Sequence, residues 1–291
     1  MRRTLLSALL ISALASIASA WHDTGHMVVA DIARARLKPN VISQIDDLLK
    51  VGGDAKTQDM FGAACWADDV RSQRRESGPW HYINYHFRLD GKETDNLPDA
   101  ENVVVAIARF KKVLGDENAT KEDRADALRF ILHFVGDVHQ PLHAVACDSD
   151  EHPNGDKGGN DFQILPPGSL ASMNRPPKNL HSLWDMAGGL YQSTPRPLTA
   201  EGIASLDKLA RHLEKENPAD KLSKEIEVSD PEAWAKEGLA IAKESVYNLK
   251  PGEAPGSDYM IKCRKICSKR LALAGYRLAN LLNEVLGSKS R

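Results

Sequence analysis

His133 and Asp137 lie within a mostly apolar stretch, 128–143, and their spacing suits metal binding. Residues four apart share one face of a helix, so the imidazole and the carboxylate would point the same way. A charged aspartate in apolar surroundings is costly unless it is paired or binds a metal ion. Pro141 should end the helix near Asp137, which places His143 just beyond its end. A histidine–aspartate pair satisfied within the core is the simpler alternative to a metal site.

Two further segments offer ligands of the same kinds. His181 and Asp185 repeat the four-residue spacing on a short predicted helix, from which a single ion could be chelated. Asp68 has Arg71 one helical turn beyond it and is followed by His81. Taken alone, these would be an exposed ion pair, a solvated helix face and a histidine at the end of a strand. Beside the histidine–aspartate pair of the apolar stretch, they favour a metal centre of imidazoles and carboxylates.

The first twenty residues have the pattern of a secretory signal peptide. A basic start at 1–3 is followed by an apolar run over 5–17 and by the small residues of 18–20, which signal peptidase recognises. The run is short for a membrane span, and no later segment has eighteen uncharged apolar residues. We therefore expect an exported soluble protein with one domain over 21–291 that begins at Trp21. An N-terminal membrane anchor is the alternative.

Cleavage before Trp21 would create a new metal ligand. A free α-amino group has a pKa near ~8, so losing its proton to bind a metal ion is cheap. Trp21 could then chelate through its amine and its carbonyl oxygen, helped by His26. Activity would in that case depend on cleavage after Ala20. The alternative is a frayed terminus, which is the commonest state of chain ends.

Helical periodicity dominates the sequence and predicts the elements that would carry these residues. We expect an all-α fold, a single compact multi-helix domain with long loops, because no internal repeat or low-complexity linker interrupts the chain. The stretch 148–179 is rich in Gly, Pro, Asp and Asn, and it predicts loops with at most a small β-hairpin around 161–164. The predicted helices cover 25–37, 41–50, 60–74, 99–114, 121–139, 180–187, 199–215, 231–248 and 258–286.

The composition is that of a globular protein and narrows the classes of function. The 291 residues are 42% hydrophobic and 27% charged, which excludes a disordered or collagen-like chain. The 38 basic and 40 acidic side chains leave a net charge of -2 without a basic tail, which argues against general electrostatic binding of duplex DNA. Cys65, Cys147, Cys263 and Cys267 fit an oxidising compartment and predict disulfide bonds, but the sequence leaves all three pairings open.

In their order along the chain, the motifs resemble the zinc-dependent nuclease type I family of extracellular single-strand nucleases and 3′-nucleotidases. The series begins with the mature tryptophan, GH, WAD and WH, and it continues with HxxxD, PLH, GGN and a second HxxxD. These motifs span 21–185, and the ordered series is specific although any single motif is not. The family shares its fold with bacterial zinc phospholipase C, so the resemblance also implies a helical domain.

The resemblance implies three zinc ions, each with its own ligands. The implied sets are Asp68, His81, His133 and Asp137 for the first ion, His143, His181 and Asp185 for the second, and Trp21, His26 and a shared Asp137 for the third. Imidazoles and carboxylates suit zinc, and each ion keeps room for water or substrate. The positive charge of three divalent ions would exceed the negative charge of the ligating carboxylates. The site would then have the local positive charge that a phosphate substrate requires.

Phosphodiester hydrolysis also follows from the resemblance. The products would be 5′-phosphorylated nucleotides, and 3′-mononucleotides would lose their phosphate. Zinc would acidify the attacking water and stabilise the 3′-oxygen as it leaves. Asp68 would orient that water, Asp137 would bridge two ions, and Arg71 would stabilise charge on the phosphoryl oxygens.

Four other residues are candidate substrate contacts. Tyr82 stands where the family places an aromatic residue for base stacking, which favours unpaired bases and hence single strands. Asn84 stands where well-known fungal members carry Asp, and because an amide can both donate and accept, the base preference stays open. Asn160 belongs to the GGN motif and Lys157 precedes it, although a lysine in a flexible loop is usually only solvated.

Two other functions stay open at this point. A zinc phospholipase C would have nearly the same ligands, although Asp185 stands where phospholipases of that group usually carry Glu. A non-catalytic zinc-binding protein is the second alternative, and the complete ligand set argues against it. We expect a secreted or periplasmic monomer without a membrane span that acts on single-stranded DNA, RNA and 3′-nucleotides.

Overall fold

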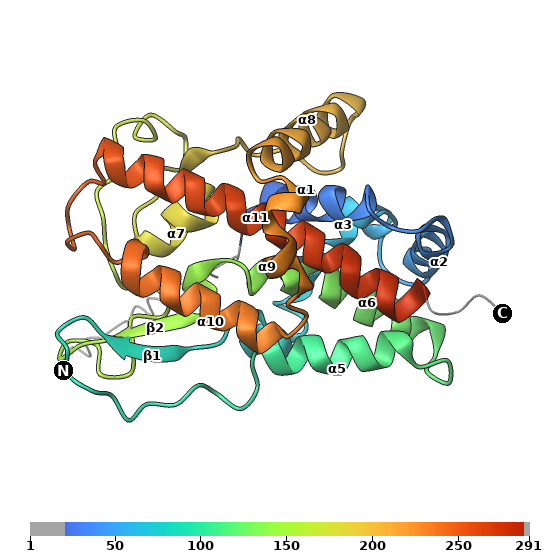
Figure 1. Ribbon diagram of the computed structural model, residues 1–291, viewed down its shortest axis with the longest axis horizontal. Coiled ribbons are helices and arrows are strands. Elements are labelled where there is room, and N and C mark those ends of the chain that lie inside the picture. The colour runs from blue at the N-terminus through green and yellow to red at the C-terminus, as the bar shows by residue number, and fades with distance from the viewer. Residues whose placement is uncertain (1–20, 288–291) are drawn as a thin grey trace, which may run out of the picture.

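The computed structural model describes residues 21–287, most of which are helical (Figure 1). The predicted signal peptide over 1–20 lies outside the described residues. The long helices are α1 (Asp23–Arg34), α2 (Pro39–Leu49), α5 (Val103–Gly115), α6 (Lys121–Asp137), α8 (Ala200–Glu216), α10 (Pro231–Ile241) and α11 (Ser257–Gly287). The short helices are α3 (Met60–Ala63), α4 (Trp66–Val70), α7 (Leu180–Asp185) and α9 (Ser223–Glu227). The predicted mostly helical fold is confirmed.

Helix α6 lies at the centre of this arrangement. The Thr120 hydroxyl caps its start by accepting a hydrogen bond from the backbone N–H of Asp123 at 3.1 Å. The helix packs against α1, α2, α5 and α11, which explains why its second half is apolar on all sides. It ends at Asp137, four residues before Pro141, as the proline predicts.

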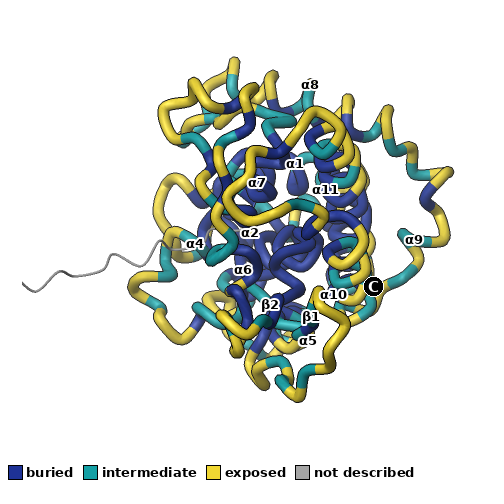
Figure 2. Tube along the Cα trace, turned by 90° about the vertical axis from the view of Figure 1, so that its left-hand side faces the viewer, coloured by how far each residue is buried: buried dark blue, intermediate teal, exposed yellow. Residues whose placement is uncertain are grey.

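Helix α11 spans much of the molecule and crosses in front of α1 and α6 in Figure 1. It packs against both of these helices and also against α2, α5 and α8. Figure 2 shows that many of the buried residues lie in α1, α6, α7 and α11, whereas the long connections are mostly exposed. Side chains at the inner ends of these helices are therefore shielded from water and held by packing on several sides.

The one small sheet among the described residues differs from the prediction. Strands β1 (Tyr85–Arg88) and β2 (Val145–Asp148) pair in parallel, with Tyr85 opposite Val145. The hairpin expected around 161–164 is wrong, because this region forms only an isolated antiparallel bridge between Gln163 and Asn179. Parallel strands need a long connection, so no local turn in the sequence signals their pairing.

The helix predicted over 60–74 is also wrong in its continuity. Helix α3 ends at Ala63 and α4 begins at Trp66, with a turn between them. Within this turn the carbonyl oxygen of Ala64 lies 2.7 Å from Nδ1 of His133 and accepts its hydrogen bond. The break therefore supplies a backbone partner to a candidate metal ligand.

All four cysteines are free and buried. The sulfur atoms of Cys263 and Cys267 lie one helical turn apart in α11, at 4.0 Å, about twice the length of a disulfide bond. The expected disulfides are absent from the described residues. The thiols are instead packed as small apolar groups.

Candidate metal centre

Four of the predicted ligands meet at the C-terminal end of α6. Asp137 Oδ2 lies 3.0 Å from Nδ1 of His81 and 3.3 Å from Nε2 of His133. Asp68, on α4, places its Oδ1 3.5 Å from His81 Nδ1 and 3.6 Å from His133 Nε2. Residues from three separate segments thus direct donor atoms at one small volume, and they are the set expected for the first ion.

A second group of donors forms around α7. The ligand atoms of His143, His181 and Asp185 all lie within 4.8 Å of one another, and His181 Nε2 is 3.3 Å from Asp185 Oδ2. A capping box fixes the start of this short helix: the Asn179 side chain accepts from the backbone of Ser182, whose hydroxyl bonds back to Asn179. The second predicted set is therefore also brought together.

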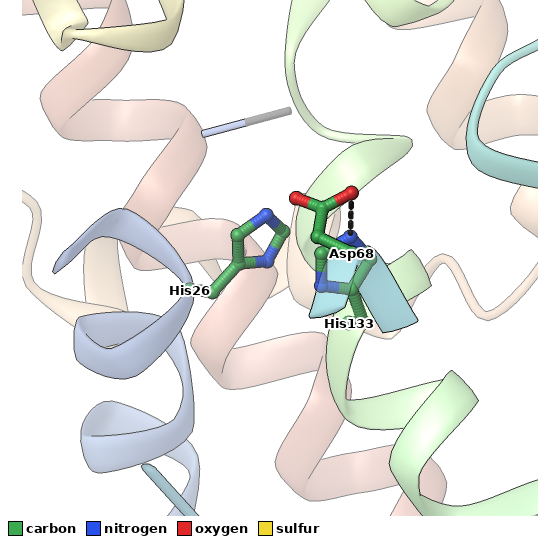
Figure 3. A group of neighbouring side chains, drawn as sticks. All are labelled: His26, Asp68 and His133. Carbon is green, nitrogen blue, oxygen red and sulfur yellow. Dashed lines mark ion pairs between the residues drawn. The ribbon is translucent and has the colours of Figure 1, made fainter. Parts of the chain in front are cut away.

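His26 brings α1 to the same place. Its Nε2 lies 3.4 Å from Asp137 Oδ1, and its ring stacks on that of His133 with 3.9 Å between centroids. Figure 3 shows His26 reaching from α1 toward His133 and Asp68. The approach depends on Gly136, because a Cβ at that position would lie 2.8 Å from His26 Nδ1.

Trp21, the first residue of the expected mature chain, is buried beside these donors. Its indole Nε1 donates a hydrogen bond to the carbonyl oxygen of Gly136 at 2.9 Å. The backbone N–H of the next residue, His22, donates to the carbonyl oxygen of Asp185 at 3.1 Å. Because this segment is anchored to both α6 and α7, it is not a frayed end.

Backbone carbonyl groups orient three of the imidazoles. In each, Nδ1 lies 2.7 Å from a carbonyl oxygen and the other nitrogen faces the donor cluster, as is usual for metal-ligating histidines. The pairs are His133 with Ala64, His143 with His81, and His181 with Gly158. Gly158 has a φ of +61°, and a Cβ there would overlap the carbonyl oxygen of Leu142, so this position requires glycine.

Several polar side-chain atoms of the cluster are buried without a hydrogen bond. They are both ring nitrogens of His26, Nε2 of His81, His133, His143 and His181, and Oδ1 of Asp137. Leaving a buried polar atom unsatisfied costs ~1–3 kcal/mol, so such a concentration indicates a site for a bound group. Imidazole nitrogens and carboxylate oxygens are ligands that zinc prefers, and the residues present fit that ion.

Burial keeps most of these imidazoles in the neutral form that binds metal. It lowers the pKa of His26, His81 and His143, and it lowers that of His181 to about 4. Burial also acts to lower the pKa of His133, but the carboxylates of Asp137 and Asp68 outweigh it and raise the value to about 9. A metal ion bound by His133 would therefore displace a proton.

A cavity of about 820 Å³ opens beside the second group of donors, where His143 and His181 form part of its wall. All of the predicted substrate contacts line it, together with Arg71; they are Tyr82, Asn84, Lys157 and Asn160. The Lys157 side chain is exposed, and its Nζ lies 3.0 Å from Asp161 Oδ2. Two of the predicted metal ligands and all of the predicted substrate contacts thus line one cavity.

The sequence analysis missed three side chains of this site. Gln140 is fully buried, donates from Nε2 to Asp185 Oδ1 at 2.6 Å, and accepts from the backbone of Leu142 through Oε1 at 2.6 Å. The one feature of the sequence that could have indicated a role for Gln140 is that its amide follows a mostly apolar run. Arg75 and Lys178 line the cavity, and as basic loop residues they carry no signal at all.

Comparison with known proteins identifies the family. The sequence profile described as S1/P1 Nuclease matches residues 21–287. The chain belongs to the S1/P1 nuclease family. "Endonuclease 4" of Arabidopsis thaliana is 27% identical over 100% of this chain and 97% of that protein. Nuclease P1 of Penicillium citrinum is 28% identical over 92% of this chain and 99% of its own, and nuclease S1 of Aspergillus oryzae is 26% identical over 96% of each.

The family match confirms the resemblance drawn from the motifs and makes this S1/P1 nuclease an enzyme that cleaves nucleic acid. The match argues against the phospholipase alternative, because it extends over all of the described residues. None of the helices within 21–287 has the length and apolar character needed to cross a membrane.

Proposed function

We propose that this S1/P1 nuclease is an exported, zinc-dependent endonuclease that hydrolyses single-stranded DNA and RNA to 5′-phosphorylated products. It would also release phosphate from 3′-mononucleotides. The observation that carries the proposal is the group of buried imidazole nitrogens without hydrogen bonds, which lies against a cavity with basic side chains in its wall. Such a site attracts an anion locally, although the chain as a whole carries a net charge of -2.

Three zinc ions are assigned to the donor groups. The first would be held by Asp68, His81, His133 and Asp137, the second by His143, His181 and Asp185, and the third by Trp21 and His26 with Asp137 shared. Asp137 is suited to serve two ions, since one of its oxygens faces His81 and His133 while the other faces His26.

The bound ions would act as Lewis acids and lower the pKa of water. Asp68 is the most exposed of the three ligating carboxylates, at 15%, so it can accept a hydrogen bond from the attacking water and orient it toward phosphorus. Arg71 lines the cavity beside His143, where its guanidinium group would donate to the phosphoryl oxygens and stabilise their charge. Asp137 is fully buried and would position metal rather than touch the substrate.

The selection of single strands is assigned to the cavity wall. The ring of Tyr82 is half-buried there and is available to stack on a base, which is worth ~1–3 kcal/mol and requires that the base be unpaired. Asn84 and Asn160 would hydrogen-bond to the base and the backbone through their amides. Lys157 would exchange its ion pair with Asp161 for a phosphate.

Export is proposed from the leader over 1–20, whose removal would free the amine of Trp21. Two observations support this boundary: the family match begins at residue 21, and the Trp21 side chain is buried against α6. The mature enzyme would be a secreted or periplasmic monomer.

An anomalous X-ray map at the zinc edge, on protein that begins at Trp21, would test the metal assignment. Three ions are expected, with the third bound beside the amine of Trp21. One extra residue before Trp21 should remove the third ion alone, and an unchanged zinc content would contradict that part of the proposal.

Activity should be compared on single-stranded DNA, RNA, duplex DNA and phosphatidylcholine. Cleavage of both single-stranded substrates with 5′-phosphate ends is expected. Preference for the duplex, or hydrolysis of phosphatidylcholine in place of nucleic acid, would overturn the proposed function.

A further inference from the structure

The wall of the substrate cavity carries more positive charge than the reacting phosphate requires. Four basic side chains line it, whereas Asp161 is the one carboxylate among the lining residues outside the metal ligands. Two of the four, Arg71 and Lys157, already have roles in the proposed function. Arg75 and Lys178 have none, and they come from the two separate stretches, 71–84 and 157–181, that form most of the cavity wall.

Both residues are attached to segments that carry proposed metal ligands. Arg75 begins the short 3-10 segment that ends at the ligand His81. Lys178 directly precedes Asn179, which caps the helix that carries His181, and the Lys178 carbonyl oxygen accepts a hydrogen bond from the backbone of Ile164 at 3.0 Å. Their backbones are therefore fixed relative to the ligands while their side chains face the cavity.

Neither side chain forms an ion pair with another described residue, in contrast to the basic residues beside them. The neighbour of Arg75 in the sequence, Arg74, lies 2.6 Å from Asp126 and packs over the ring of Trp66, so its charge serves the fold. Lys157 has Asp161. Exposed cations that line a cavity and have no carboxylate as an ion-pair partner are suited to bind an anionic ligand.

We propose that Arg75 and Lys178 bind backbone phosphates of the nucleotides that flank the cleaved bond. This inference rests on the proposed function and deepens it, because it assigns two named side chains to the nucleotides beside the cleaved bond. Arg71 and the metal ligands account for the reacting phosphate, so two further cations are left for phosphates that a 3′-mononucleotide does not have. A volume of about 820 Å³ is at the upper end of the ~300–1,000 Å³ of ligand sites, which leaves room for adjoining nucleotides.

The proposal predicts a measurable dependence on salt. Each phosphate neutralised on a single strand contributes about −0.7 to the slope of log K against log salt, and an exposed contact of this kind changes affinity roughly fivefold. Arg75→Gln and Lys178→Gln should each raise the Kd for a single-stranded hexanucleotide by that factor and should each make the slope shallower by about 0.7. The two effects should multiply in the double variant, because separate contacts combine additively in free energy.

The experiment compares holoenzyme variants on two kinds of ligand. Kd is measured with a hydrolysis-resistant, fluorescently labelled hexanucleotide at several salt concentrations, and kcat/KM is measured for a cleavable hexanucleotide and for a 3′-mononucleotide. Arg175→Gln is the matched control, because Arg175 is an exposed arginine near Lys178 that does not line the cavity, and its loss changes the net charge equally. In both test variants, but not in the control, the ratio of kcat/KM for hexanucleotide to mononucleotide should fall about fivefold.

Two results would overturn the inference. Test variants with the same Kd and salt slope as Arg175→Gln would remove the assigned contacts, and an equal loss on the mononucleotide would place these side chains at the reacting phosphate instead. A parent enzyme that cleaves neither substrate would refute the proposed function, whereas the binding measurement with the resistant hexanucleotide would still decide the inference.

Discussion

Two buried clusters of polar side chains lie at the C-terminal end of α6, and they differ in how their atoms are satisfied. In the metal centre, His133 gives Nδ1 to the carbonyl oxygen of Ala64, while its Nε2 makes no hydrogen bond. Six residues further along, His139 is equally buried, but its Nδ1 contacts the Val135 carbonyl oxygen at 2.7 Å and its Nε2 contacts Arg277 at 2.9 Å.

The second cluster, which we call the arginine cluster, consists of His139, Glu237, Arg270 and Arg277. The Glu237 carboxylate accepts hydrogen bonds from both guanidinium groups. Arg270 donates to one of its oxygens, and Arg277 donates to both. Arg270 also donates to the carbonyl oxygens of His139 and Trp234 at 2.8 and 3.0 Å. Within this cluster the donors thus have protein acceptors, and no further group is needed.

The difference teaches how to recognise a ligand among buried histidines. Burial lowers the pKa of His139 as it lowers those of His26 and His143, so neutrality alone does not separate them. The separating feature is the second ring nitrogen, which has a protein partner in a structural histidine and lacks one in a ligand. Substitutions in the metal centre should therefore lower the zinc content, whereas substitutions in the arginine cluster should lower the free energy of unfolding.

The largest effect is expected for Asp137→Asn. The two side chains have nearly the same shape, but the amide cannot supply two anionic oxygens to adjacent ions, so zinc content should fall and activity should drop by more than ~100-fold. Zinc analysis and kcat on single-stranded DNA measure both quantities. A variant that keeps three ions and full turnover would remove Asp137 from the centre.

The next effect is expected for Glu237→Gln, the matching substitution in the arginine cluster. Removing the carboxylate leaves two buried guanidinium groups uncompensated, and the free energy of unfolding should fall by about 3 kcal/mol, with the zinc content unchanged. Burial acts to raise the pKa of Glu237, but Arg277 and Arg270 outweigh it and hold the value below the ordinary one. Because its pKa is lowered, ionised Glu237 stabilises the folded state at pH values above the ordinary pKa of glutamate. The difference in the free energy of unfolding between the variant and the parent should therefore become smaller as the pH falls below ~4.

Urea unfolding at several pH values measures this loss. A loss of zinc comparable to that of Asp137→Asn, at a pH where the variant is still folded, would contradict the division between the two clusters.

The sequence predicts the first cluster far better than the second. His133 and Asp137 stand out because metal-binding residue types interrupt a mostly apolar helix, and His143 follows just beyond its end, so the anomaly is visible without a structure. The other members of the arginine cluster come from α10 and α11, and Arg277, which contacts the His139 ring, lies 138 positions along the chain from it. A long-range hydrogen bond leaves no local pattern, and so its members read as ordinary surface charges.

The same reasoning explains the other misses. Helix positions follow from local periodicity, and so most were predicted to within a few residues. The parallel pairing of β1 with β2, the break before Trp66 and the cavity-lining side chains of Arg75 and Lys178 depend on how distant segments meet. The packing between distant segments determines those features, and it cannot be derived from a single sequence.

A smaller effect is expected for Gln140→Ala, because Gln140 shares a feature with each of the two clusters. Both the nitrogen and the oxygen of the Gln140 side-chain amide have hydrogen-bond partners, and one of these partners is the proposed ligand Asp185. Loss of an outer partner of this kind typically weakens metal binding by 10–100-fold, and here the loss should be confined to the second ion. Titration with a competing chelator measures each affinity; equal weakening of every ion, or lower stability with unchanged affinity, would make Gln140 a structural residue only.

The smallest effect is expected at Arg196, whose ion pairs connect two ligand-bearing segments at the edge of the metal centre. It lies 2.7 Å from Asp23, at the start of α1, and contacts both oxygens of Asp69, next to the proposed ligand Asp68, at 2.7 Å. Asp23 and Asp69 are about two-fifths exposed, so Arg196→Lys, which loses the bidentate contact, should cost at most ~1 kcal/mol of stability.

Arg211→Lys is the matched control for that substitution, because Arg211 also contacts one aspartate, Asp207, through two nitrogens but lies on α8 with no metal ligand beside either residue. If the pairs of Arg196 hold α1 against α4, zinc should dissociate faster from Arg196→Lys than from the control although both lose similar stability. Equal rates of zinc loss to a chelator would show that the contact between these two helices depends on their buried packing alone.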